Sequence, residues 1–254
     1  MKCNDFIAAD DRGYLYGDAL FETVRVRPDG SIRWLDAHLQ RLRKSGEALG
    51  FGVEAIEAGV EKLGALGEQK PGIWRVTVSR PGVDAQGQSL PFGGSGALRL
   101  RFREYHAPGR PNLGLAPGFY LPEDRLAEHK TTSFLRAIEV RRRAQLRGFD
   151  DAIMTSAAGL IGEASCANVI VVGAGGAATP PVRGILPGVT RAGVLRRARE
   201  VDQPIEVREI GVAELQGARE IILLSAGVGV LAAASFEGRA LDDSWATNAR
   251  TWLP

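Results

Sequence analysis

Alternation of apolar and polar residues marks the strands expected near the start of the chain. The runs 21–26 and 31–34 flank the turn Pro28-Asp29-Gly30 and predict a hairpin. Two more alternating runs, 73–80 and 98–103, predict further strands, and the second has apolar residues on one face and arginines on the other. These strands predict one small sheet.

Spacings of three and four between apolar residues predict two helices between these strands. The first is expected from Leu35 to Gly50 with Asp36 as its N-cap, and the second covers 53–66. The loop 81–96 is rich in Gly, Pro and Gln and has no period, so it is either functional or disordered. Together these elements predict a small α+β domain over residues 1–104.

A second, larger domain is expected to follow a short connector. Residues 105–111 hold two prolines and a glycine, which is typical of an interdomain connector. Residues 112–254 form the larger domain. The elements predicted in it are strands at 151–155, 167–172, 205–210 and 220–224, helices at 134–147 and 192–200, and an amphipathic helix after Leu241.

Composition narrows the function classes. The 254 residues are 44% hydrophobic, and the net charge of +2 comes from mixed charges, so neither nucleic acid nor an anionic membrane is an expected partner. Cys3 and Cys166 lie far apart and lack metal-ligand spacing, which fits a reducing cytoplasm, with Cys166 as buried packing. No metal site, signal peptide or membrane-spanning run is expected, so the predicted location is the cytoplasm.

Lys130 is the first candidate for chemistry. The chain holds 32 Lys and Arg residues, and the lysines among them are Lys2, Lys44, Lys62, Lys70 and Lys130. An ammonium group can lose its proton and become a nucleophile, whereas a guanidinium group cannot. Lys130, at the start of a predicted helix, is therefore either a catalytic amine or a solvated residue at a helix start.

Glu163 is a candidate partner for a cationic group. It lies 33 residues after Lys130 (163 minus 130), directly before a predicted buried strand. Burying a lone carboxylate costs several kcal/mol, so it needs a cation or several hydrogen bonds. A protonated ring nitrogen would serve, although an N-cap or salt-bridge role is also open.

Two turns of small residues and one arginine could bind a phosphate. Gly188 and Thr190 precede a predicted helix, and Ser225-Ala226-Gly227 follows a predicted strand, so both turns can offer backbone amides. Arg41 on a helix face could add a charge-assisted bond, unless it forms a plain surface ion pair. An amine, a carboxylate, an arginine and amide-rich turns are the groups that a pyridoxal-phosphate site needs.

The order of these motifs resembles the class IV aminotransferases, the fold-type IV pyridoxal-phosphate enzymes. The matching motifs are Asp11-Arg12-Gly13, Tyr16-Gly17-Asp18, Phe21-Glu22, His38-Leu39-Gln40-Arg41-Leu42 with Ser45, Lys130, Glu163 with Asn168, and Leu186-Pro187-Gly188-Val189-Thr190-Arg191. The resemblance runs from Asp10 to about Arg239. It implies a two-domain α+β fold with a small N-terminal α/β domain and a larger C-terminal domain with a β-barrel-like core.

The resemblance also implies roles for single residues and a homodimer. Lys130 resembles the lysine that forms the Schiff base with pyridoxal 5'-phosphate, and Glu163 resembles the partner of its ring nitrogen. The positions that match phosphate contacts are Arg41, Gly188, Val189, Thr190, Ser225 and Ala226. The positions that match the substrate pocket are Tyr16 and Phe21.

Departures from the family pattern bear on the substrate. Leu135 stands where branched-chain enzymes have a tyrosine, and Ala226 stands where a serine or threonine often contacts phosphate. The loop after Ser79 lacks the arginine that binds a substrate carboxylate in D-amino acid aminotransferases. Arg25 and Arg80 are the candidates to take over this role, and a structural surface arginine is the alternative for each.

We therefore expect a transaminase that moves an amino group between an amino acid or amine and an α-keto acid. The alternative is a 4-amino-4-deoxychorismate lyase that gives 4-aminobenzoate and pyruvate. The third reading is a non-catalytic protein that kept the fold. The joint presence of Lys130, Glu163 and Arg41 argues against it.

Overall fold

The structure is a computed structural model that describes residues 7–83 and 88–254, and these divide into two compact units. The first unit runs to His106 and also includes His129–Phe134. The second unit consists of Ala107–Glu128 and Leu135–Pro254. The short segment that carries Lys130 therefore groups with the first unit, although Ala107–Glu128 separates it from that unit in sequence.

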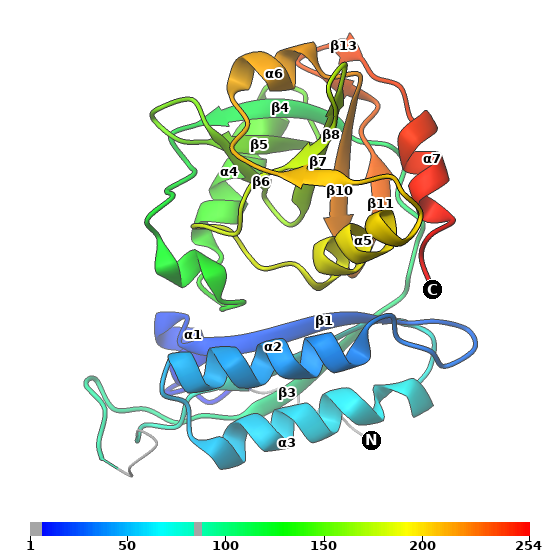
Figure 1. Ribbon diagram of the computed structural model, residues 1–254. Coiled ribbons are helices and arrows are strands. Elements are labelled where there is room, and N and C mark those ends of the chain that lie inside the picture. Colours follow the sequence, from blue (N-terminus) through cyan, green and yellow to red (C-terminus); the bar gives the residue numbers. More distant parts are fainter. Residues whose placement is uncertain (1–6, 84–87) are drawn as a thin grey trace. The chain divides into compact units, whose positions relative to one another are not determined.

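The first unit is an antiparallel three-stranded sheet with two helices on one face (Figure 1). Its elements are α1 (Arg12–Tyr16), β1 (Ala19–Val26), α2 (Leu35–Ala48), α3 (Val53–Gly64), the 3-10 helix η1 (Ala65–Glu68), β2 (Gly72–Ser79) and β3 (Leu98–Arg103). The strand order is β1-β2-β3, so β1 lies at an edge. Side chains alternate across the strands, and Leu20, Val24 and Val76 pack in the apolar clusters beneath the helices.

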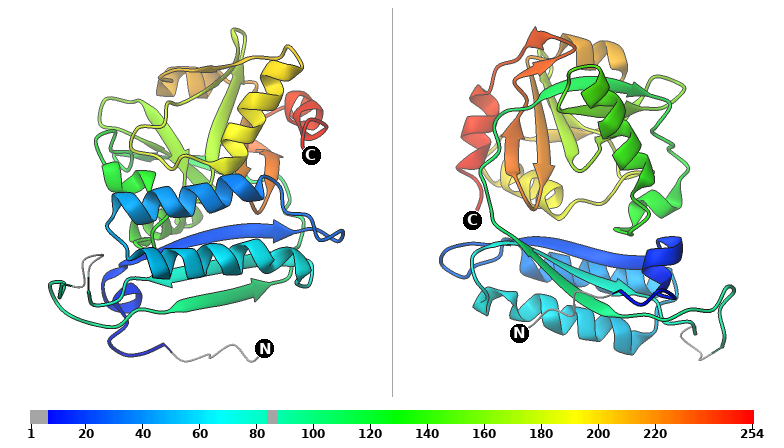
Figure 2. Two further views of the ribbon diagram at one scale, coloured as in Figure 1. Left: turned by 60° about the horizontal axis from the view of Figure 1, so that its bottom comes forward. Right: turned by 180° about the vertical axis from the view of Figure 1, so that it is seen from behind.

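Figure 2 shows α2 and α3 side by side over this sheet. The start of α2 differs from the prediction, because Trp34 is the N-cap and Asp36 lies in the first turn. Trp34 adopts a left-handed conformation with φ 53°, and its carbonyl accepts bonds from the amides of Ala37 and His38. Asp36 as the N-cap was therefore wrong. Its carboxylate instead lies where the helix dipole favours negative charge.

The second unit contains two five-stranded sheets, with strand orders β11-β10-β7-β8-β9 and β13-β12-β4-β5-β6. Its elements are β4 (Asn112–Pro117), the 3-10 helix η2 (Arg125–Glu128), α4 (Leu135–Leu146), β5 (Asp151–Thr155), β6 (Ile161–Ala164), β7 (Asn168–Gly173), β8 (Gly176–Thr179), α5 (Val189–Glu200), β9 (Ile205–Val207), α6 (Val212–Gly217), β10 (Glu220–Ser225), β11 (Gly229–Ala232), β12 (Ser235–Phe236), β13 (Arg239–Ala240) and α7 (Ser244–Arg250). The α+β fold class is confirmed. A barrel-like closure of these sheets stays a prediction.

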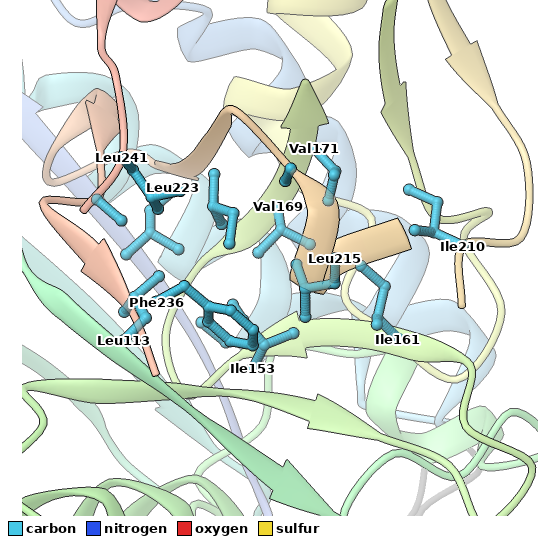
Figure 3. Close-up of a cluster of buried hydrophobic side chains, with 14 of the residues drawn as sticks. Leu113, Ile153, Ile161, Val169, Val171, Ile210, Leu215, Leu223, Phe236 and Leu241 are labelled. Carbon is cyan, nitrogen blue, oxygen red and sulfur yellow. The ribbon is translucent and has the colours of Figure 1, made fainter. Parts of the chain in front are cut away.

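Both sheets of the second unit contribute to one apolar core. Figure 3 shows Leu113 and Ile153 from one sheet beside Val169 and Leu223 from the other, with the ring of Phe236 among them. All five side chains are buried. The alternation of the strands directs every second side chain into this core, which holds β6 and β7 in place.

Cys166 is exposed, so its prediction as buried packing was wrong. It lies in the bend between β6 and β7, where the neighbouring Ser165 is the buried residue and donates a hydrogen bond to Asp151 Oδ2. The bend can bury only one of the two side chains. Cys3 lies outside the described residues.

The helices found in residues 7–83 and 88–254 include none with the length and apolar character needed to cross a bilayer. The same part of the chain holds no group of three or more His, Cys, Asp or Glu side chains that could bind a metal ion.

Removal of the Phe236 ring is expected to destabilise the second unit. Phe236→Ala should lower the free energy of unfolding by about 3–5 kcal/mol, because it leaves a cavity between the two sheets. Leu146→Ala is the matched control from the same unit, because Leu146 is 74% exposed, and it should change the value by about 0.5 kcal/mol or less. Urea unfolding measures both, and equal effects of the two changes would contradict the assigned core.

Candidate functional site

Lys130 is held against the edge of β1 by backbone hydrogen bonds. The Phe21 amide donates to the Lys130 carbonyl at 2.9 Å, and the Thr132 amide donates to the Ala19 carbonyl at 2.9 Å. Leu20 and Thr131 form an antiparallel bridge between these two bonds. The segment thus covers an otherwise open sheet edge and fixes the backbone of Lys130 beside Phe21.

Two cationic side chains contact the ring of Phe21. Lys130 Nζ lies 4.5 Å and Arg75 Cζ lies 3.5 Å from the ring centroid. Phe21 is buried, and Phe134 packs edge-on against it at 5.7 Å. Burial and the nearby Arg101 hold the pKa of Arg75 below its ordinary value, and no carboxylate in the described part of the chain offsets them.

Arg75 was not among the residues predicted from the sequence. It pairs with Thr23 on β1, and Thr77 pairs with Phe21, so Arg75 shares a sheet face with Phe21. Its Nε donates to Thr77 Oγ1 at 3.2 Å. The alternation of the run 73–80 could have indicated this face, but the pairing partner could not be read from local sequence.

Arg41 is oriented by a buried carboxylate. Its Nε and Nη2 each donate to Glu22 at 2.7 Å, and His38 Nδ1 lies 2.8 Å from Glu22 Oε2. Burial alone would raise the pKa of Glu22, but the charge of Arg41 and the hydrogen bonds from His38 and Arg41 outweigh it and hold the pKa at about 2. This arrangement fixes a guanidinium group on the β1 side of α2.

Glu163 is fixed by its neighbours in the second unit. Its Oε2 accepts from Asn168 Nδ2 at 2.9 Å, and its Oε1 accepts from the Leu186 amide at 3.3 Å. Asn168 Nδ2 also donates to the Leu186 carbonyl at 2.9 Å. A Cβ at Gly188 would overlap Asn168 Oδ1, so only glycine fits there. Asn168 therefore joins the Glu163 carboxylate to the turn before α5.

The start of α5 is suited to an anion. Gly188 is its N-cap, no side chain caps the helix, and Val189 and Thr190 are buried in its first turn. The first amides of a helix have no acceptor within the helix, and they favour negative charge. Arg191 is tied down by bonds to Thr179 Oγ1 and the Pro180 carbonyl, and burial lowers its pKa.

The other predicted phosphate turn is a tight hairpin. Ser225 ends β10 and pairs with Gly229 at the start of β11, with Ala226 in the connecting turn. The Val228 amide donates to Ser225 Oγ at 3.4 Å, and Gly229 has φ 70°. The Ser225 hydroxyl therefore faces the backbone of its own turn.

The arginines expected to read a carboxylate have other contacts. Arg80 pairs with Asp18 and donates to the carbonyls of Leu49 and Gly50 at 2.7 and 2.9 Å. These bonds hold together parts of the first unit. Arg25 stacks on the ring of Tyr105, with Cζ 3.4 Å from the centroid.

Tyr16 lies at the end of α1 and is 46% exposed. Its hydroxyl donates to the Phe92 carbonyl at 3.3 Å, and the two rings lie 5.7 Å apart. The predicted site residues thus fall into two groups. Those in the first unit are Tyr16, Phe21, Arg25, Arg41, Arg80 and Lys130, and those in the second are Glu163, Gly188, Val189, Thr190, Ser225 and Ala226.

Replacement of Glu22 is expected to remove the buried carboxylate that pairs with His38 and Arg41. Glu22→Gln should lower the free energy of unfolding at pH 7 by about 3–5 kcal/mol. The ordinary pKa of 4.5 is depressed to about 2 in the fold, so Glu22 stabilises the protein fully above about pH 4.5 and less as the pH falls toward 2. The difference between wild type and variant should therefore narrow over that interval.

Urea unfolding at a series of pH values measures this difference. Glu57→Gln is the matched control, because Glu57 forms an exposed pair with Arg43 and should leave the stability unchanged. A Glu22→Gln effect that stays constant from pH 7 to the acid limit of folding would contradict the assignment.

Comparison of the chain with known proteins identifies its family. The amino-transferase class IV family model matches residues 19–236. A D-alanine aminotransferase of Bacillus licheniformis is 26% identical over 243 residues, which are 91% of this chain and 83% of that protein. The residues that the family model matches include both groups of site residues except Tyr16.

Two solved structures share the fold. A branched-chain aminotransferase of Thermoproteus uzoniensis has a TM-score of 0.82 at 23% identity, covering 98% of this chain and 89% of that one. A 4-amino-4-deoxychorismate lyase of Pseudomonas aeruginosa has a TM-score of 0.79 at 23% identity, covering 97% and 93%. The chain belongs to the class IV aminotransferases, a family of pyridoxal-phosphate-dependent enzymes.

Proposed function

We propose that this protein is a transaminase for substrates that carry a carboxylate, transferring an amino group from an amino acid to an α-keto acid. The observation that carries the proposal is the pair of cations on the Phe21 ring. Lys130 supplies an amine, and Arg75 supplies a half-buried guanidinium group beside it. An amine substrate without a carboxylate would leave Arg75 without a counter-charge.

The residues present fit pyridoxal 5'-phosphate. When bound, this cofactor supplies an aldehyde for attachment of an amine and a ring that accepts electrons from the substrate. Lys130 Nζ would be the amine that holds the cofactor, and it is the group that would carry a proton near the substrate carbon. Glu163, held by Asn168 and the Leu186 amide, presents a carboxylate for the protonated ring nitrogen.

In the second unit, the start of α5 is the part that we assign to the phosphate. The absence of a Cβ at Gly188 keeps the backbone close to Asn168, and the first-turn amides of Val189 and Thr190 then offer hydrogen bonds. In the first unit, Glu22 sets the direction of the Arg41 guanidinium group, which the family resemblance matches to a phosphate contact. Ser225 and Ala226 add backbone amides of a tight turn.

Arg75 is the arginine that we assign to the substrate carboxylate, in place of Arg25 or Arg80. Planar guanidinium groups bind carboxylates through two parallel hydrogen bonds. Arg80 already binds Asp18 and two carbonyls, and Arg25 lies over Tyr105. Arg75 instead donates to one neutral hydroxyl and shares the Phe21 ring with Lys130.

We also propose that the enzyme is a homodimer that acts in the cytoplasm. Exposed aromatic side chains on the first unit support an interface, since Tyr14 is 66% and Phe92 is 83% exposed. The sequence, with its two distant cysteines, supports a reducing compartment.

The first test is spectroscopic. Purified wild-type protein with pyridoxal 5'-phosphate should show a visible absorbance band that Lys130→Ala lacks, because the variant has no amine to bond. D-alanine, a branched L-amino acid and an (R)-amine are then added separately. Loss of the band with formation of the amine form of the cofactor, for an amino acid but not for the (R)-amine, is the expected result.

Two outcomes would contradict the proposal. Absence of the band in the wild-type protein would show that the cofactor does not bond at this site. Release of pyruvate from 4-amino-4-deoxychorismate, without formation of the amine form by any amino acid, would establish the lyase reaction in place of transamination.

The second test concerns Arg75. Arg75→Gln should raise KM for the keto acid by about 10–100-fold, because a charged hydrogen bond to the carboxylate is lost. Arg43→Gln is the control from the first unit, because Arg43 forms an exposed pair with Glu57, and it should change KM by about twofold or less. Steady-state kinetics of both variants measure the effect, and an unchanged KM in Arg75→Gln would remove Arg75 from this role.

A further inference from the structure

The segment that carries Lys130 has a side-chain anchor on α2. His129 Nδ1 lies 3.1 Å from Ser45 Oγ, within hydrogen-bond distance. Ser45 is 4% exposed and lies on the same face of α2 as His38 and Arg41, at spacings of three and four residues. The contact therefore belongs to the buried polar face of α2 and is not a surface contact.

His129 and Lys130 are directed to opposite faces of the sheet in the first unit. Ser45 belongs to α2, which covers the same face as Leu20 and Glu22 of β1. Phe21 points to the other face, and Lys130 Nζ follows it there. His129 and Lys130 lie in a tight turn, in which the Thr131 amide donates to the His129 carbonyl at 3.0 Å, so the anchor of one side chain constrains the direction of the next.

A shift of this turn along β1 would move the Lys130 side chain away from Phe21. Backbone pairing of the segment with β1 rests on one bridge and two hydrogen bonds, from the Phe21 amide and from the Thr132 amide. Such a short pairing specifies register weakly on its own. Ser133 Oγ also donates to the Gly17 carbonyl, over a long distance of 3.4 Å.

We infer that His129 is a positioning residue, which through Ser45 locks the register that directs the Lys130 amine toward Phe21. The inference rests on the proposed role of Lys130 as the amine that bonds to the cofactor. It adds a requirement beyond the motif residues named in the sequence, namely a hydrogen bond between the residue before the lysine and the helix that carries Arg41. The bond acts on the placement of the amine and takes no part in proton transfer.

The test follows the attachment of Lys130 to the cofactor. Apoprotein is mixed with pyridoxal 5'-phosphate, the rise of the visible band is timed, and borohydride is added at intervals to trap the bond. Peptide mass spectrometry then gives the fraction of Lys130 that is modified. His129→Ala and Ser45→Ala should each slow the modification by about tenfold, as expected for loss of one hydrogen bond.

Two further variants separate positioning from folding. His129→Asn keeps a polar atom near the place of Nδ1 and should attach the cofactor at a rate within about threefold of wild type. The double variant His129→Ala with Ser45→Ala should be no slower than either single variant, because both remove the same bond. Thermal unfolding by circular dichroism reports whether each variant is folded, and rates are compared among folded variants.

The outcomes distinguish failure of the positioning role of His129 from failure of the proposed function. Wild-type protein in which borohydride modifies no Lys130 would overturn the proposed function itself. Normal modification in wild type together with a normal rate in His129→Ala, or additive effects in the double variant, would overturn the positioning role alone.

Discussion

The first unit depends on the buried carboxylate of Glu22. Its side chain is 1% exposed, and it binds His38 and Arg41 across the boundary between β1 and α2. A carboxylate in such a place is tolerated only when its partners satisfy it, so β1 and α2 have one relative placement in which all three groups are paired. The strand that carries Phe21 and the helix that carries Arg41 and Ser45 are thereby fixed to each other.

The same strand supports the lysine. Because β1 is an edge strand, its outer hydrogen-bonding groups are open to the segment 129–134, and Phe21 and Ala19 exchange backbone bonds with it. Placement of Lys130 therefore follows from the placement of β1. In the second unit Asn168 plays a comparable part, because one amide side chain sets both the carboxylate of Glu163 and the turn before α5.

Local sequence pattern predicted much of this fold and part of the site. Alternation predicted β2 and β3 closely. The order of motifs assigned Lys130, Glu163 and the start of α5 to the site, and these roles stay predictions. Arg75, His129 and the partner of Arg41 were missed, since each depends on a neighbour far away in sequence. Strand pairing of Thr23 with Arg75 and packing of Ser45 against His129 arise from tertiary structure, which no period of two or 3.6 residues encodes.

The grouping of residues 129–134 with the first unit also has a consequence for dissection of the protein. The chain passes between the units at three places, after His106, after Glu128 and after Phe134. A fragment that ends at His106 would lack residues 129–134, which cover the edge of β1. The remaining fragment would contain residues 129–134 without β1. A single cut in the chain therefore cannot separate the two units cleanly. A split protein would hold the Lys130 amine beside Phe21 only if both pieces reassembled around β1.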